Sequence, residues 1–281
     1  MPQSIRAILA NAGMRLKEIS DSPMLDAELI LAHCLEKNRS FLHTWPEKQL
    51  DTNQLDCFES HIAKRQTDYP VAYILGYKAF WTFDLKVTED VLIPRPETEL
   101  LVELALEKIS DVKNPKILDL GTGSGAISLA LASERNDAKI IATDYSEKAL
   151  EIATENARNL KLDHQIEFKQ SDWFSAINEN DFDLIVSNPP YIAKEDEHLK
   201  QSIRHEPISA LVAENNGMSD IETIISESRK HLKEGAWIML EHGFEQHSQT
   251  QQLFNQYPFK NARSVKDLNG NMRVTMAQYQ G

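Results

Sequence analysis

The chain has 281 residues, a length typical of one large domain or two smaller ones. Its 41% hydrophobic and 26% charged residues exclude a disordered or membrane protein, and no apolar run approaches the ~18 residues of a spanning helix. Two cysteines, Cys34 and Cys57, are too few for a disulfide framework and are interpreted as free thiols of a soluble cytoplasmic protein. The net charge of −13 disfavours a nucleic-acid partner and favours a basic protein partner.

The first third of the chain has the apolar periodicity of helices. It predicts helices over residues 4–19, 22–36 and 51–68, the last capped by Asp51 and stopped by Pro70. We therefore expect a small helical-bundle domain over residues 1–70. Aromatic and β-branched residues follow, and they predict a β-hairpin, turning at residues 82–84, within a linker over residues 71–95.

After Pro115 strands and helices alternate, which predicts an α/β domain over residues 96–281 with a mainly parallel sheet covered on both faces. Strands are expected at 116–120, 139–143, 165–170, 182–187, 236–241, 262–266 and 273–279. Helices are expected at 97–109, 124–134, 146–160, 218–232 and 245–256. The last two strands must be antiparallel, because their connection is too short for a parallel crossover.

A glycine loop follows the first of these strands: Gly121, Thr122, Gly123, Ser124, Gly125. Glycines there let the backbone approach a ligand at a helix N-terminus. Asp144 ends the next strand, where a carboxylate can accept both hydroxyls of a ribose. The pattern indicates an adenosine-type cofactor without naming it, and an NAD-binding oxidoreductase stays open. The plainer alternatives are a tight turn without a ligand and an Asp144 that merely caps the following helix.

A second motif follows the strand 182–187: Asn188, Pro189, Pro190, Tyr191. It lies at the carboxyl end of a strand, where open α/β sheets bind their ligands. The Asn188 side chain offers a carbonyl acceptor, the prolines leave carbonyls without competing N–H groups, and Tyr191 offers an aromatic face. Such a set suits a planar substrate that presents an NH₂ group.

With these motifs the chain resembles the release factor glutamine methyltransferase family, the N5-glutamine methyltransferases that use S-adenosylmethionine (SAM). The resemblance covers essentially the whole chain. Its motifs are Ile93 to Glu99, Leu118 to Ile127, Ser171 to Phe174, Ser187 to Ile192, Glu206-Pro207 with Ala210-Leu211, and Leu240 to Gly243. It implies a seven-stranded, Rossmann-like class I SAM-dependent methyltransferase domain with an antiparallel final strand, joined by the hairpin to the helical domain.

The resemblance also implies roles for residues. The loop Gly121 to Gly125 would wrap the methionine part of SAM, Asp144 would hold the ribose, and Asp172 and Trp173 would hold the adenine. Plainer interpretations make Asp172 a cap and Trp173 a core residue. Asn188 would serve both cofactor and substrate, with Asn188, Pro189 and Tyr191 as the catalytic set and Pro190 beside them against the substrate. No metal is expected.

The expected reaction is methyl transfer from SAM to the N5 amide of the glutamine in the Gly-Gly-Gln loop of class-1 bacterial release factors, with S-adenosylhomocysteine as product. No membrane and no direct nucleic-acid contact are expected. The alternatives are a ribosomal-protein glutamine methyltransferase, a DNA adenine-N6 methyltransferase, and a binding module without activity. The helical domain would supply the docking surface for the protein substrate.

Four further residues carry weaker expectations. The roles of Arg95 and Glu97 are left open, and Glu206 is left outside the catalytic set because it could pair with Arg204 on the surface. His242 follows a strand and could act as a general base, but a neutral, hydrogen-bonded structural histidine is the preferred interpretation.

Overall fold

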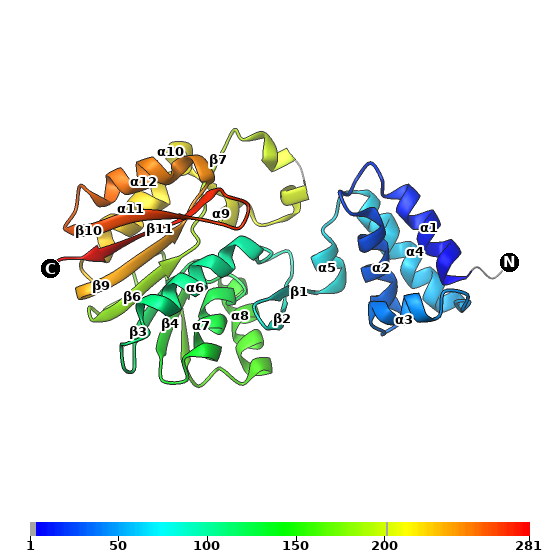
Figure 1. The fold of residues 1–281 in the computed structure, drawn as a ribbon, viewed down its shortest axis with the longest axis horizontal. Helices are drawn as coiled ribbons and strands as arrows, with labels where there is room; N and C mark the ends of the chain where they lie inside the picture. Colours follow the sequence, from blue (N-terminus) through cyan, green and yellow to red (C-terminus); the bar gives the residue numbers. More distant parts are fainter. Residues whose placement is uncertain (1–3, 201) are drawn as a thin grey trace. The chain divides into compact units, whose positions relative to one another are not determined.

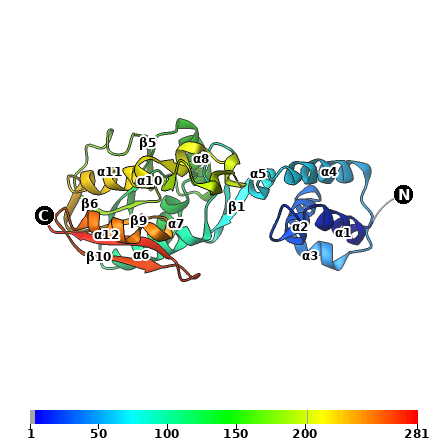
Figure 2. The same cartoon turned by 90° about the horizontal axis from the view of Figure 1, so that it is seen from above.

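The computed structural model describes residues 4–200 and 202–281, whose elements fall into two units. The first unit comprises the chain up to Tyr77 together with the segment Glu197–His205, and the second comprises Lys78–Asp196 and Glu206–Gly281. Each unit has its own helices and core (Figures 1 and 2). None of the helices in the described ranges has the length and apolar character needed to cross a membrane.

The first unit is a helical bundle. Its helices are α1 (Ile5–Arg15), α2 (Pro23–Cys34), α3 (Arg39–Thr44), α4 (Thr52–Gln66) and α5 (Val71–Leu75). Helix α4 begins at Asp51 with a capping box shared with Gln54, as the sequence predicted. Apolar residues at helical spacing, among them Ile8, Leu31 and Phe58, meet in one core.

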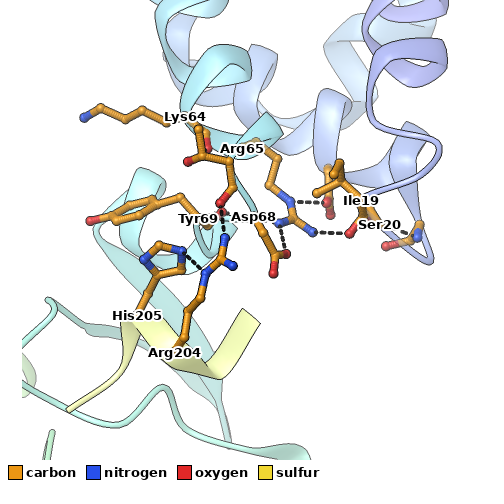
Figure 3. Close-up of polar contacts among 11 residues, drawn as sticks. Ile19, Ser20, Lys64, Arg65, Asp68, Tyr69, Arg204 and His205 are labelled. Carbon is orange, nitrogen blue, oxygen red and sulfur yellow. Dashed lines mark hydrogen bonds and ion pairs between the residues drawn. The ribbon is translucent and has the colours of Figure 1, made fainter. Parts of the chain in front are cut away.

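A buried arginine holds the ends of these helices together. The Arg65 Nε atom donates to Asp26 Oδ2 at 2.8 Å, and its other nitrogens donate to Asp68 Oδ1 and to the carbonyl oxygens of Ile19 and Tyr69 (Figure 3). Every arm of the guanidinium therefore has an acceptor, which is the condition for burying a charge without a large penalty.

The segment Glu197–His205 comes from the second half of the sequence but packs within the helical unit. Arg204 Nη2 donates to the Thr67 carbonyl at 2.8 Å, and the His205 ring lies edge-on to Tyr69 with centroids 5.3 Å apart (Figure 3). Two 3-10 helices, η2 (Glu197–Lys200) and η3 (Ser202–His205), make up this segment.

The second unit is built on a seven-stranded sheet of order β10-β11-β9-β6-β3-β4-β5. Its strands are β3 (Lys116–Leu120), β4 (Lys139–Asp144), β5 (Ile166–Gln170), β6 (Phe182–Ser187), β9 (Leu232–Glu241), β10 (Phe259–Lys266) and β11 (Met272–Tyr279). Strand β11 runs antiparallel to both β9 and β10, and the other pairs are parallel. The predicted fold class and the antiparallel final pair are confirmed.

Helices cover both faces of this sheet. On one face lie α6 (Glu99–Lys108), α7 (Ala126–Glu134) and α8 (Glu147–Leu160), and on the other lie α11 (Ser219–Ser228) and α12 (His247–Phe254) (Figure 1). The 3-10 helices η1 (Pro96–Thr98) and η4 (Phe244–Gln246) precede α6 and α12. Between β6 and α11 come the short elements β7 (Ile192–Ala193), α9 (Ile208–Leu211), β8 (Val212–Ala213) and α10 (Glu214–Gly217).

Three local predictions were wrong. The hairpin consists only of β1 (Tyr77–Phe80) and β2 (Phe83–Lys86), because residues 71–75 form α5, which ends at Gly76 with a left-handed φ of 78°. The hairpin turns at Trp81 and Thr82 rather than at 82–84, and Trp81 takes a φ of 56°. The helix expected to reach residue 232 ends at Ser228, since Leu232 already pairs with Phe182 at the start of β9.

Candidate active site

The glycine loop follows β3 and leads into α7. Gly121, Gly123 and Gly125 have φ angles of 71°, 56° and 87°, a region that side chains disfavour. A Cβ atom on Gly125 would lie 3.0 Å from Leu129 Cδ1 and 3.3 Å from Ala153 Cβ, whereas one on Gly123 would meet nothing within 4 Å. Gly125 therefore allows close helix packing, and Gly123 faces open space.

Asp144 connects the end of β4 to this loop. Its Oδ2 accepts from the Gly123 N–H at 2.8 Å, and its Oδ1 accepts from the Ser146 N–H at 2.9 Å. Burial raises the pKa of the Asp144 carboxyl, and the backbone hydrogen bonds oppose that rise. Ser146 is the N-cap of α8 and its side chain accepts from the Ala149 N–H, while Asp144 accepts from the N–H of this N-cap residue and so also contacts the start of the helix.

A second carboxylate, that of Asp119, contacts the glycine loop through Thr122, and no role was predicted for it from the sequence. Asp119 is fully buried, and its Oδ2 accepts from the hydroxyls of Thr122 and Ser128, while its Oδ1 has no partner among the described residues. Burial raises the pKa of Asp119 to about 6, and the two hydroxyl hydrogen bonds limit the rise. The signal available in the sequence was a charged residue inside an otherwise apolar strand.

A cavity opens at the carboxyl ends of the parallel strands. Of the residues predicted for the site, it is lined by Gly121, Gly123, Asp144, Asp172, Trp173, Asn188 and Pro190. Asp172 is exposed, and the half-buried Trp173 ring would lie 3.6 Å from a Cβ on Gly121. Trp173 takes a left-handed φ of 46°, which is unusual for a residue with a large side chain, and it does so beside the cavity.

The other predicted residues lie outside the cavity lining. They are Thr122, Ser124, Gly125, Pro189 and Tyr191. Within these loops the side chains of Thr122, Ser124 and Pro189 are buried. These five residues belong to the same two loops as the lining residues, so they are next to the cavity in the sequence without lining it.

Asn188 is held at the cavity by a chain of polar contacts. Its Nδ2 donates to Thr98 Oγ1 at 3.2 Å, and the Thr98 hydroxyl in turn donates to Glu241 Oε2 at 2.7 Å. Since the Thr98 hydrogen is committed to the carboxylate, Thr98 can only accept from Asn188, which fixes the orientation of the amide. Asn188 Oδ1 is buried and has no partner among the described residues. The site therefore keeps one acceptor open.

Glu241 also holds Tyr191. The Tyr191 hydroxyl donates to Glu241 Oε1 at 3.4 Å. Burial raises the pKa of the fully buried Glu241 to about 7, against the Thr98 and Tyr191 hydrogen bonds and the charge of Arg273, and burial also raises the pKa of Tyr191. Close packing fixes the same loop from outside, because a Cβ on Gly217 would lie 2.1 Å from the Tyr191 carbonyl oxygen.

The expectation that Glu206 could pair with Arg204 on the surface is wrong. Glu206 is buried, and its carboxylate accepts from the Ile93 N–H at 3.0 Å and from Arg95 Nη2. Arg204 instead contacts Thr67 in the helical unit. Glu206 therefore secures the segment before α6, and its neighbours Pro207 and Ala210 line the cavity. The negative charge of Glu97 contributes to the raised pKa of Glu241, after the larger effect of burial.

His242 is a structural residue, as preferred from the sequence. It is fully buried, with Nδ1 2.8 Å from the Gly243 carbonyl and Nε2 2.7 Å from the Thr275 hydroxyl. Burial lowers the pKa of His242 to about 4, so the ring is neutral near pH 7 and both nitrogens are engaged.

Comparison with known proteins gives the family. Residues 96–215 match the family described as "Methyltransferase small domain", and residues 7–76 match the family described as "PrmC N-terminal domain". Curated proteins named release factor glutamine methyltransferase are 46% identical in Aliivibrio fischeri, covering 99% of both chains, and 48% identical in Shewanella oneidensis, covering 96% of this chain and 94% of that one. The relative of the same name in Escherichia coli is 43% identical over 93% of this chain and 94% of its own.

Solved structures agree on the fold. A methyltransferase from Pyrococcus furiosus superposes with a TM-score of 0.55 at 17% identity, covering 79% of this chain and 98% of that one. A ribosomal protein L11 methylase from Lactobacillus delbrueckii gives 0.51 at 19% identity, covering 70% of this chain and 86% of that one. The oxidoreductase alternative is wrong, because the relatives at 46% and 48% identity are release factor glutamine methyltransferases. The chain is a SAM-dependent methyltransferase that belongs to the release factor glutamine methyltransferase family.

Proposed function

We propose that this protein transfers a methyl group from SAM to the side-chain amide nitrogen of the glutamine in the Gly-Gly-Gln loop of class-1 peptide chain release factors, in the cytoplasm. The observation that carries the proposal is the orientation of Asn188. Its Nδ2 is engaged by Thr98, and its buried Oδ1 is an acceptor without a partner among the described residues. A buried acceptor without a partner is costly, and a substrate NH₂ group would satisfy it.

The cavity fits the cofactor. When bound, SAM supplies an activated methyl group on a positively charged sulfur. Gly121 and Gly123 leave the backbone open to the methionine part, and Asp144 offers carboxylate oxygens to the ribose at the end of β4. The Trp173 ring and the exposed Asp172 carboxylate supply a flat surface and an acceptor for an adenine amino group.

The chain's own residues align and tune the acceptor. In this proposal Asn188 Oδ1 accepts one amide hydrogen of the glutamine and the Pro189 carbonyl accepts the other, while Tyr191 holds the amide plane from one side. An amide nitrogen is a poor nucleophile because its lone pair is delocalised, so fixing both hydrogens matters most. Holding the nitrogen in line with the methyl carbon at ~3 Å supplies the orientational part of catalysis.

No strong base is needed before transfer. Transfer would form the nitrogen–carbon bond as the sulfur–carbon bond of SAM breaks, and the glutamine nitrogen would become acidic only then, so that its proton could leave to water. Tyr191 is unsuited to the role of a base because its pKa is raised and its hydroxyl is committed to Glu241. Glu241 acts from behind Thr98, which makes it a positioning residue rather than a base.

Residues 1–70, which form most of the helical unit, are proposed as the docking domain for the protein substrate, with residues 71–95 as the linker and residues 96–281 as the methyltransferase domain. The helical unit has a core of its own, and the described residues that line the cofactor cavity all belong to the second unit. A glutamine flanked by glycines can enter a narrow cavity, because its neighbours carry no side chains.

The test is an intact-mass assay with SAM and four substrates: a class-1 release factor, its variant with the loop glutamine changed to alanine, a ribosomal protein, and duplex DNA. We expect the mass of one methyl group on the first and none on the others. Equal labelling of the release factor and its alanine variant would reject the glutamine as acceptor. Labelling of the ribosomal protein or the DNA in place of the release factor would reject the substrate class.

A further inference from the structure

Two cysteines and a histidine meet in the helical unit, far along the sequence from the methyltransferase motifs. Cys34 is the last residue of α2, and Cys57 and His61 lie one turn apart on α4, which packs against α2. The Sγ atoms of Cys34 and Cys57 lie 3.4 Å and 3.7 Å from the same atom, His61 Nδ1. All three ligand atoms lie within 4.8 Å of one another.

The two sulfur–nitrogen separations are close to those of a tetrahedral zinc site. With Zn–S bonds of about 2.3 Å and Zn–N bonds of about 2.0 Å, ligand atoms at tetrahedral corners lie about 3.5–3.8 Å apart. Residues four apart on a helix share one face, so Cys57 and His61 need no backbone change to bind one ion. Neutral imidazole and thiolate are also the ligands that zinc prefers.

The surroundings leave room for an ion and a fourth ligand. A cavity lined by His33, Cys34, Glu36 and Cys57 reaches the cluster, and the side chains of all three cluster residues are half-buried. The His33 ring lies with its centroid 5.8 Å from that of His61. A turn of the His33 side chain, or a water molecule in the cavity, can therefore complete four-coordination.

We propose that Cys34, Cys57 and His61 bind one zinc ion, which joins the end of α2 to α4. Binding converts the two thiols to thiolates and releases two protons to solvent, while His61 binds through Nδ1. The site is structural, because it lies in the unit that contributes no residue to the cofactor cavity. It stabilises the folded helical unit by binding that state and not the unfolded chain.

Two other uses of the cysteines fit the geometry less well. A disulfide between Cys34 and Cys57 would leave His61 without a role, although its Nδ1 is close to both sulfurs. A single reactive cysteine would need His61 beside one thiol only, whereas His61 Nδ1 lies 3.4 Å from one sulfur and 3.7 Å from the other.

The experiment uses the full chain, reduced and stripped of metal with a chelator. Zinc is titrated in competition with a chelating dye, and cobalt serves as the spectroscopic probe of thiolate ligation. We expect one equivalent of zinc, thiolate-to-cobalt absorption, and a higher unfolding temperature with zinc than without. Cys57→Ser and His61→Ala should each weaken zinc binding by about 100-fold and cancel the thermal shift. His43→Ala removes an exposed histidine of the same unit outside the cluster and should change neither.

Folding of the variants is checked separately. SAM binding and circular dichroism without metal show whether Cys57→Ser is folded, and the cobalt spectrum of His61→Ala shows whether thiolate ligation alone remains. Zinc binding of equal strength in the parent and both cluster variants would overturn the proposal. The proposal would also be overturned if the reduced protein bound no added zinc. The same holds if a Cys34–Cys57 disulfide formed and zinc had no effect on unfolding.

Discussion

The helical unit and the sheet unit differ in how completely their buried polar side chains are hydrogen-bonded. In the helical unit, buried Arg65 and Asp26 pair directly, and every further arm of the guanidinium finds an acceptor. In the sheet unit, Glu206 likewise pairs with an arginine, Arg95. Two other buried carboxyls, Asp119 and Glu241, have hydroxyl partners instead, and burial raises their pKa values to about 6 and about 7. The buried side-chain atoms without a partner, among the described residues, all lie in the sheet unit: Asp119 Oδ1, Gln165 Oε1 and Asn188 Oδ1.

This difference separates polar groups that stabilise the fold from polar groups that can bind a ligand. A satisfied charge network stabilises a fold but offers nothing to a ligand, whereas an open acceptor costs stability and can bind one. Left-handed φ angles do not follow this division, because they occur at Glu36 and Asp68 in the helical unit as well as at Trp173 beside the cavity. From the difference in hydrogen bonding, changes in the first unit should act on stability, and changes at the cavity should act on binding and transfer.

The largest effect is expected from Arg65→Met. It leaves Asp26 buried without its partner, which should lower the free energy of unfolding of the helical unit by about 3–5 kcal/mol. Chemical denaturation followed by circular dichroism measures the loss. The control is Arg15→Met, whose partially exposed pair with Glu59 should contribute less than about 1 kcal/mol. Equal losses in the two variants would show that the Arg65 network is no more stabilising than a surface pair.

Asn188→Ala should have the largest effect on transfer. It removes one positioning contact at the acceptor, so kcat should fall by about 100- to 1,000-fold, while SAM affinity stays within a few-fold. The measurements are methylation kinetics with a release factor and calorimetry with SAM. Asn255→Ala, at an exposed position after α12, is the matched control. A normal kcat in Asn188→Ala would remove Asn188 from the proposed mechanism.

Much of the sheet unit and of its cavity lining was predictable from the sequence. The periodicity of strands and helices gave the sheet unit, and Gly121, Gly123, Asp144, Asp172, Trp173, Asn188 and Pro190 do meet at one cavity. Such residues are predictable because each lies at the carboxyl end of a strand, and these ends share one edge of the sheet.

The supporting residues were not predictable in the same way. Thr98 and Glu241 are 143 positions apart in the sequence, and only the packing of η1 against the end of β9 brings their side chains together. Arg95 and Glu206 are likewise 111 positions apart. Long-range pairs of this kind have no periodicity or spacing in the sequence, and for that reason Glu206 was assigned the wrong partner.

Asp144→Ala tests the cofactor side of the cavity. It should weaken SAM binding by about 1–3 kcal/mol, because hydrogen bonds to a charged group are lost and the Gly123 N–H loses its acceptor. Calorimetry measures the change, with Asp163→Ala as an exposed control in the same unit. Unchanged affinity in Asp144→Ala would contradict the ribose contact.

A smaller effect on kcat is expected at Thr98, which contacts Asn188 rather than the substrate. Thr98→Val keeps the shape of the side chain but removes the acceptor for Asn188 Nδ2, and it should lower kcat by about 10-fold with SAM affinity unchanged. Thr98→Ser retains the hydroxyl and should restore most of the rate. If the valine and serine variants had equal rates, the hydroxyl would have no part in orienting Asn188.

The smallest effect is the pH dependence set by Glu241. Burial raises its pKa from 4.5 to about 7, so the folded protein binds this proton more tightly than the unfolded chain does. The resulting contribution to the free energy of unfolding is fully present below about pH 4.5 and is lost as the pH rises through about 7. The ionised Glu241 is therefore a cost to stability.

The ionised form of Glu241 is also the state in which the carboxylate accepts from Thr98, leaving Thr98 to accept from Asn188. A protonated Glu241 can donate to Thr98 and disturb that order, so transfer should fall several-fold as the pH drops through about 7.

Glu241→Gln carries no titrating proton and should give a flat transfer profile across this range, while its unfolding free energy should no longer decline there. The measurements are kcat across pH and chemical denaturation at the same pH values. A profile that keeps its step near pH 7 in Glu241→Gln would assign the titration to another group and would break the link between the cost of Glu241 and the orientation of Asn188.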